Sequence, residues 1–101
     1  MSHLKDRVVM ITGAGSGFGA LLAEGSLARG AKVVALDLSK EGMTGRLGEQ
    51  PNLLLHEADV RRRSDLDDAV RTAMDTFGGV DILVNNAGTC LLYTSPSPRD
   101  S

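Results

Sequence analysis

The feature that most constrains the fold of this chain is a glycine-rich segment at residues 12–19, which reads TGAGSGFG. It follows the short apolar, β-branched run VVMI at residues 8–11 and precedes apolar residues at helical spacing. A helix start with free N–H groups can bind phosphate, and glycine lets the backbone approach that phosphate closely. The segment therefore predicts a strand, a phosphate-binding turn and a helix. The alternative, that the glycines only permit close packing of helix on strand, is less favoured in this context.

Three further apolar runs predict buried strands, near residues 33–36, 53–55 and 80–84. Helical patterns separate the runs at residues 18–28 and 64–77, and a weaker pattern with three glycines lies at residues 41–50. This alternation predicts an α/β fold, a Rossmann-type doubly wound parallel sheet that continues to a fourth strand. With 101 residues, the chain is long enough for one compact domain.

The two stronger helical patterns also predict which side chains face the core. One apolar stripe of the helix at residues 18–28 is expected to face the core. It consists of Phe18, Leu21, Leu22, Gly25 and Ala28. Gly30 is expected to end that helix. In the second, Ser64 and Asp67 have the spacing of a capping box, and Gly78 is expected to end the helix. Its expected apolar face consists of Leu66, Ala69, Val70, Ala73 and Phe77.

Composition excludes several classes of protein. Eleven Lys and Arg against thirteen Asp and Glu leave no basic excess, which argues against a nucleic-acid-binding module. No apolar run approaches the roughly 18 residues that a membrane span needs. A single cysteine cannot form an intramolecular disulfide. We therefore expect a cytoplasmic protein with neither a nucleic acid nor a membrane as its partner.

Asp37 follows the second apolar run, at the edge where open α/β sheets bind ligands. A carboxylate there can accept hydrogen bonds from both ribose hydroxyls of an adenosine and would repel a 2′-phosphate. Ser16, in the glycine turn, offers no cation for such a phosphate. Both residues favour NAD over NADP. The alternative is a solvated aspartate near Lys40.

Four motifs in this order resemble the classical short-chain dehydrogenases/reductases over residues 5–89. TGAGSGFG at residues 12–19 matches the family's TGxxxGxG, and residues 85–88 match its NNAG. Asp59 and Val60 match the pair that follows the family's third strand, and Asp37 matches the acidic residue of NAD-preferring members. Jointly these motifs are specific to the family, although any one of them alone would not be.

The resemblance implies a role for each matching residue. The pyrophosphate turn would consist of Gly13, Ser16, Gly17, Phe18 and Gly19. Asp37 would hold the adenosine ribose, and Asp59 and Val60 would line the adenine pocket. Asn86, Ala87 and Gly88 would support the cofactor and brace the sheet. Phe18 stands where the family more often has Ile or Leu, and we expect it still to face the core.

The family's chemistry is hydride transfer between a nicotinamide and a small alcohol or carbonyl substrate, carried out by homodimers or homotetramers. Its catalytic Tyr, Lys, Ser and Asn all lie beyond NNAG. Tyr93 does not match that Tyr, because Ser97 stands where the pattern requires Lys. We therefore assign no catalytic and no metal-binding residue here. A non-catalytic dinucleotide sensor on the same fold is the alternative, and a P-loop hydrolase is disfavoured because no Gly-Lys-Ser/Thr is present.

Two other groups of residues have simpler interpretations. His56 is expected to be a partly buried structural histidine, since no neighbouring cluster supports a base or a ligand. The basic run of Arg61, Arg62 and Arg63 is expected to be a solvated turn ahead of an acidic helix start, although one of them could touch the cofactor.

Residues 90–101, CLLYTSPSPRDS, depart from the preceding pattern. The string resembles the translation of a transposase-type sequencing adaptor, and our hypothesis is read-through at the end of a DNA fragment. Residues 1–89 would then be the NAD-binding half of a Rossmann domain without catalytic capacity of its own, and 90–101 a non-native tail. The rival interpretation is a genuine disordered tail. The source nucleotide sequence distinguishes the two.

Overall fold

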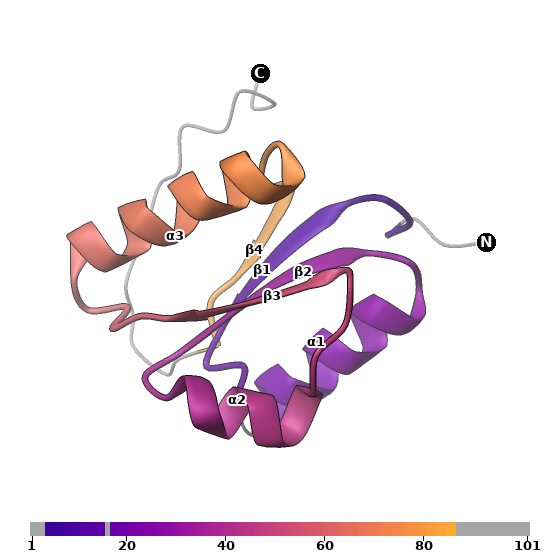
Figure 1. Cartoon of the computed structure of the whole chain (residues 1–101), viewed down its shortest axis with the longest axis horizontal. Helices are drawn as coiled ribbons and strands as arrows, with labels where there is room; N and C mark the ends of the chain where they lie inside the picture. The colour runs from indigo at the N-terminus through magenta and orange to yellow at the C-terminus, as the bar shows by residue number, and fades with distance from the viewer. Residues whose placement is uncertain (1–3, 16, 87–101) are drawn as a thin grey trace.

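The computed structural model describes residues 4–15 and 17–86, which form one parallel sheet covered by helices on both faces (Figure 1). Along the chain the elements are β1 (Val8–Thr12), α1 (Gly17–Ala28), β2 (Lys32–Asp37), α2 (Lys40–Leu47), β3 (Leu53–Glu57), α3 (Arg63–Phe77) and β4 (Ile82–Val84). None of these helices is long and apolar enough to cross a membrane. The predicted alternation of strands and helices is confirmed, including the weakly predicted α2.

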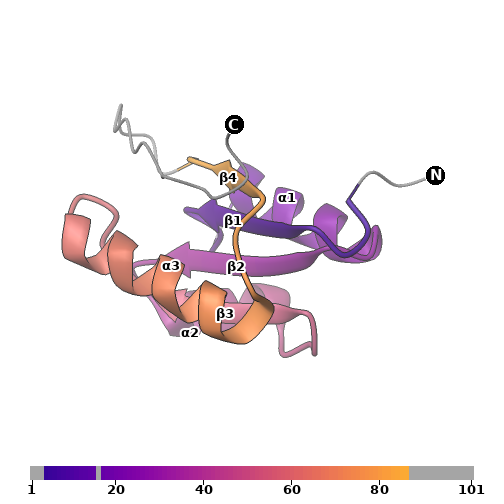
Figure 2. The same cartoon turned by 90° about the horizontal axis from the view of Figure 1, so that it is seen from above.

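The strands lie in the order β3-β2-β1-β4, and every pairing is parallel (Figure 2). The chain moves from β1 outward to β3 and then returns to the other side of β1. Because crossovers between parallel strands are right-handed, this reversal puts α1 and α2 on one face and α3 on the other. The sheet is therefore doubly wound, as predicted.

The central strands β1 and β2 are buried on both faces, which explains their continuous apolar sequence. Val9 and Ile11 belong to the core shared with α1 and α2, together with Met43 of α2. Val8 and Met10, whose side chains alternate with those two, belong to the core under α3. Two hydrophobic layers thus hold the strand ends at one edge of the sheet.

The apolar stripe predicted for α1 is wrong in part. The buried residues of this helix are small, namely Gly19, Ala20, Ala23 and Ser26. Phe18 and Leu21 of the predicted stripe are 65% and 57% exposed, so Phe18 does not face the core. The reason is steric, because a Cβ at Gly19 would collide with the Gly13 carbonyl oxygen and come within 2.6 Å of Asn86 Nδ2. At Gly19, helix α1 lies too close to the turn for a side chain, whereas Leu22 and Leu27 are partly buried against the core.

Helix α2 forms despite its glycines because it is capped and anchored. Ser39 Oγ accepts a hydrogen bond from the backbone N–H of Gly42 at 3.2 Å, which satisfies a free donor of the first turn. Met43 and Leu47 are buried against the sheet. Tertiary packing thus outweighs the low helix propensity that made the sequence pattern weak.

Helix α3 shows the predicted apolar face but not the predicted capping box. Leu66, Ala69 and Ala73 are buried, and Gly78 ends the helix in the left-handed conformation at φ 86°. The N-cap, however, is Arg62 with no side-chain cap, and Ser64 lies inside the helix. Asp65 in the first turn instead accepts a hydrogen bond from the backbone N–H of Asp59 at 2.8 Å. That bond ties the start of α3 to the chain segment after β3.

Candidate functional site

The glycine turn lies at the carboxyl end of β1, where α1 begins. Gly13 and Gly17 adopt positive φ angles of 65° and 57°, a conformation that side chains disfavour. Helix α1 starts at Gly17, so the N–H groups of its first turn lack partners within the helix. Ser16, also predicted for this turn, lies outside the described residues. The turn and helix start form the local structure that the phosphate-binding prediction requires.

Gly19 has a packing role in the described structure. The collision that any Cβ would make with Gly13 and Asn86 shows how closely α1 approaches the turn and the end of β4. The interpretation of close helix–strand packing therefore holds at Gly19. Gly13 and Gly17, in contrast, are glycines because of their positive φ angles. Close packing and backbone conformation therefore each account for different glycines of one motif.

The Asp37 carboxylate is held at the end of β2 by two backbone donors. Gly15 N–H donates to Oδ2 and Leu38 N–H donates to Oδ1, each at 2.7 Å. A Cβ at Gly15 would come within 2.6 Å of that Oδ2, so only glycine permits this approach. Each carboxylate oxygen retains acceptor capacity for a ligand. Gly15 was not among the predicted site residues, although its place inside the glycine turn was a signal.

The carboxylate of Asp59, which follows β3, is held by Arg61. The guanidinium donates from Nε to Oδ1 and from Nη2 to Oδ2, both at 3.0 Å, and the Arg61 backbone N–H also donates to Oδ1. These hydrogen bonds from Arg61 lower the pKa of Asp59 from 3.8 to about 2. The same pair raises the pKa of Arg61. Asp59 is therefore an acceptor-only group at neutral pH.

Asn86 is positioned by a buried threonine on β1. Thr12 is 2% exposed, and its hydroxyl accepts a hydrogen bond from the Asn86 backbone N–H at 2.8 Å while donating to Asn85 Oδ1 at 2.9 Å. These bonds join the carboxyl ends of β1 and β4. Ala87 and Gly88, predicted to act beside Asn86, lie outside the described residues. Thr12 is a positioning residue that the sequence interpretation did not single out.

A cleft of about 560 Å³ runs along these strand ends, a volume typical of sites for small molecules. Its lining residues are Gly13, Gly17, Phe18, Asp37, Leu38, Ala58, Asp59, Val60, Arg61 and Asn86. The sheet order reverses between β1 and β4, and open α/β sheets bind ligands at such a reversal. The fold thus gathers predicted residues from all four strand ends into one cleft.

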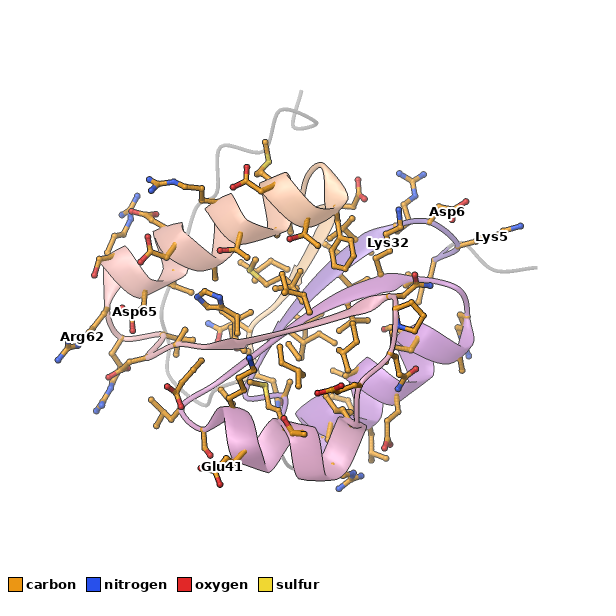
Figure 3. All side chains as sticks on the ribbon, in the orientation of Figure 1. Lys5, Asp6, Lys32, Glu41, Arg62 and Asp65 are labelled. Carbon is orange, nitrogen blue, oxygen red and sulfur yellow. The ribbon has the colours of Figure 1, made fainter. Side chains whose placement is uncertain are left out.

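The basic run before α3 divides into residues with different surroundings. Arg61 lies in an exposed turn, as expected, with 69% of its side chain exposed, and it also lines the cleft. Arg62 extends outward from the start of α3, near Asp65 (Figure 3). Leu38 and Ala58 also line the cleft and were not predicted. Their position directly after β2 and β3 was the available signal.

Comparison with known proteins determines the family. Residues 7–99 match the sequence pattern of the family described as short chain dehydrogenase. The chain belongs to the short chain dehydrogenase family. It is 41% identical to the 2-(R)-hydroxypropyl-CoM dehydrogenase of Xanthobacter autotrophicus, over 89% of this chain and 40% of that protein. It is 40% identical to a CLA biosynthesis dehydrogenase/reductase of Lactiplantibacillus plantarum, over 90% of this chain and 33% of that protein.

Solved structures of short chain dehydrogenases share this fold. The 3-ketoacyl-(acyl-carrier-protein) reductase of Brucella melitensis, complexed with NADH, matches with a TM-score of 0.75 and 44% identity over 79% of this chain and 34% of that chain. The hydroxysteroid dehydrogenase of Escherichia coli matches with a TM-score of 0.75 and 33% identity, over 85% of this chain and 38% of that chain. The chain therefore spans between a third and two fifths of the length of the relatives compared here.

Proposed function

We propose that this short chain dehydrogenase chain binds NAD in the cleft at its strand ends. The whole protein would transfer a hydride between nicotinamide and a small alcohol or carbonyl substrate. The observation that carries the proposal is the meeting of the glycine turn with the two carboxylates, Asp37 and Asp59, in one cleft. The relative complexed with NADH supports the choice of a nicotinamide cofactor.

The residues present fit the chemical groups of a dinucleotide. The amino end of α1 and the glycine turn would hold the pyrophosphate, because backbone N–H groups and the helix dipole favour an anion there. Ser16 would take part in the same turn, and Phe18, which lines the cleft and is exposed, would form one wall. Asn86 would support the cofactor where β1 and β4 end, with Ala87 and Gly88 following it.

Preference for NAD over NADP would follow from Asp37. Its carboxylate is already fixed by two backbone N–H groups, so it can accept ribose hydroxyl hydrogen bonds without being ordered first. A 2′-phosphate would instead meet a fixed negative charge. Asp59 and Val60 would line the adenine end, with Asp59 as the acceptor for an amino group.

NAD, when bound, would supply the nicotinamide ring that accepts or returns the hydride. The described residues contribute binding and orientation, and the proton-transfer groups would belong to the remainder of the protein. We propose that the chain by itself binds cofactor without catalysing the reaction. The whole protein would be a cytoplasmic homodimer or homotetramer, without nucleic acid or membrane partners.

A binding experiment tests this function. Binding can be followed by the emission of the reduced nicotinamide ring of NADH itself. We expect NADH to bind at least about 10-fold more tightly than NADPH, because a fixed charge opposes the phosphate. ADP-ribose should compete with NADH, since it carries the same pyrophosphate and adenosine. Tighter binding of NADPH than NADH would contradict the role given to Asp37, and the absence of NADH binding would contradict the proposed function.

A further inference from the structure

Arg61 is an exposed side chain whose guanidinium is paired with a carboxylate at the wall of the cleft. Although 69% of the side chain is exposed, it makes two parallel hydrogen bonds to the Asp59 carboxylate, and its own backbone N–H makes a third. A long surface side chain ordinarily samples many rotamers. Here the planar guanidinium fork matches the carboxylate, so both groups are oriented together at the wall of the cleft.

The hydrogen bonds leave the two Asp59 oxygens unequal. Oδ1 accepts from both the backbone N–H and Nε of Arg61, which uses its two lone pairs. Among the residues that the structure describes, Oδ2 accepts from Nη2 alone, which leaves one lone pair for a ligand. The backbone of Asp59 is itself fixed by the bond from its N–H to Asp65. One acceptor site therefore remains, with its direction set by Arg61.

We propose that Arg61 is a specificity-determining residue, which orients Asp59 so that Oδ2 accepts a hydrogen bond from the 6-amino group of adenine and rejects a 6-oxo purine. This inference rests on the proposed function, since it concerns the adenine end of the same cleft. An amino group donates a proton to the free lone pair. The carbonyl oxygen of hypoxanthine would instead place a second acceptor against that lone pair, so no hydrogen bond forms between the two oxygens.

The hydrogen bonds from Arg61 also act on the protonation of Asp59. They lower its pKa from 3.8 to about 2, so the carboxylate stays ionised to lower pH than an unpaired aspartate and carries no proton to donate to a carbonyl. A lysine at this position would keep the positive charge but could not form two parallel bonds. An Arg61→Lys variant therefore separates the effect of the positive charge from the effect of the two parallel hydrogen bonds.

The test compares NADH with reduced nicotinamide hypoxanthine dinucleotide, which has a 6-oxo group and a protonated N1 where adenine has a 6-amino group and an unprotonated N1. Both ligands are titrated into the full chain and into its Arg61→Gln and Arg61→Lys variants. Arg71→Gln is the matched control, because Arg71 is an exposed residue of α3 outside the cleft lining. Circular dichroism compares the folds of all four proteins.

We expect the unsubstituted chain to prefer NADH by about 10-fold, a ratio set by one charge-assisted hydrogen bond in a partly exposed cleft. Arg61→Gln should reduce that ratio to about 2-fold or less by weakening NADH binding, with little change for the hypoxanthine ligand. Arg61→Lys should give an intermediate ratio, and Arg71→Gln should leave it unchanged.

The outcomes separate this inference from the proposed function. Equal binding of the two ligands by the unsubstituted chain, or an Arg61→Gln variant that keeps the full ratio, would overturn the inference alone. Equal weakening of both ligands in Arg61→Gln would also overturn it, because a purely structural or electrostatic role acts on both. Failure of the unsubstituted chain to bind either ligand would overturn the inference and the proposed function together.

Discussion

Asp37 is the last residue of β2, and Asp59 lies two residues after the neighbouring parallel strand β3; both line one cleft, yet they are held by different means. Backbone N–H groups hold Asp37, one of them from Gly15, 22 residues away in sequence. The Asp59 carboxylate is held by Arg61, two residues along the chain. The first arrangement is built by the fold, whereas the second is built by local sequence.

This difference has energetic consequences. Backbone donors in a turn lose no side-chain entropy when they bind a carboxylate, and their geometry does not depend on a mobile charge. An exposed ion pair such as Arg61–Asp59 contributes little to stability and is screened by salt. We therefore infer that the end of the cleft at Asp37 is the more rigid and that the end at Asp59 is the more adjustable.

The largest expected effect comes from removing the charge at the rigid end. Asp37→Asn should weaken NADH binding by about 30- to 100-fold, because hydrogen bonds to a charged group contribute about 1.5–3 kcal/mol each. NADPH binding should fall much less, since repulsion of the 2′-phosphate is relieved. Asp75→Asn, at an exposed position of α3, is the control. A loss for NADPH as large as that for NADH would remove the contrast between the two carboxylates.

An intermediate effect is expected from displacing Asp37 while leaving its charge. Gly15→Ala places a Cβ 2.6 Å from Oδ2, so the carboxylate must rotate away from its donor. NADH binding should weaken about 10-fold, the equivalent of about 1.4 kcal/mol, as measured by titration. Gly25→Ala, where no atom lies within 4 Å of the new Cβ, should leave binding unchanged and stabilise α1 by about 0.5–1 kcal/mol. Equal binding by both variants would show that Asp37 is not held rigidly.

The smallest effect is expected at the adjustable end, in the titration of Asp59. Carboxyl carbon chemical shifts should report a pKa of about 2, rising toward 3.8 in Arg61→Gln as the hydrogen bonds from Arg61 are lost. Because the folded-state pKa is depressed, the contribution of this pair to stability is complete above pH 3.8 and is lost as pH falls toward 2. Added salt should reduce the shift. An unchanged pKa in Arg61→Gln would mean that Arg61 does not hold this carboxylate.

Prediction from sequence was most accurate where the determining interactions are local. Uninterrupted β-branched runs predicted β1 and β2, and Gly30 and Gly78 ended their helices with positive φ as expected. The capping box at Ser64 failed because Asp65 bonds to the backbone of Asp59, a tertiary contact that moves the helix start. The sequence pattern around Ser64 does not indicate this hydrogen bond between Asp59 and Asp65.

The site shows the same division. The glycine turn, Asp37, Asp59 and Asn86 were predicted from residue type and spacing, and Gly13, Gly17 and these three side chains line one cleft. The contacts that Gly15 and Arg61 make with the two carboxylates were not predicted, because they depend on which atoms the fold brings together. Gly15 is glycine because of a carboxylate on another strand, and Arg61 belongs to the site because its guanidinium reaches Asp59.

The amino-acid sequence by itself determined the alternation of strands and helices, the glycine turn and the family, because these depend on side-chain type at fixed spacing. Only the tertiary structure decided which face of α1 is buried. The close approach of Gly19 to Gly13 admits small residues there and turns Phe18 toward the cleft. The tertiary structure also decided how each carboxylate is held. Hydrogen bonds join atoms that are close in space, whether their residues are 22 positions apart in sequence, as for Gly15 and Asp37, or two, as for Arg61 and Asp59.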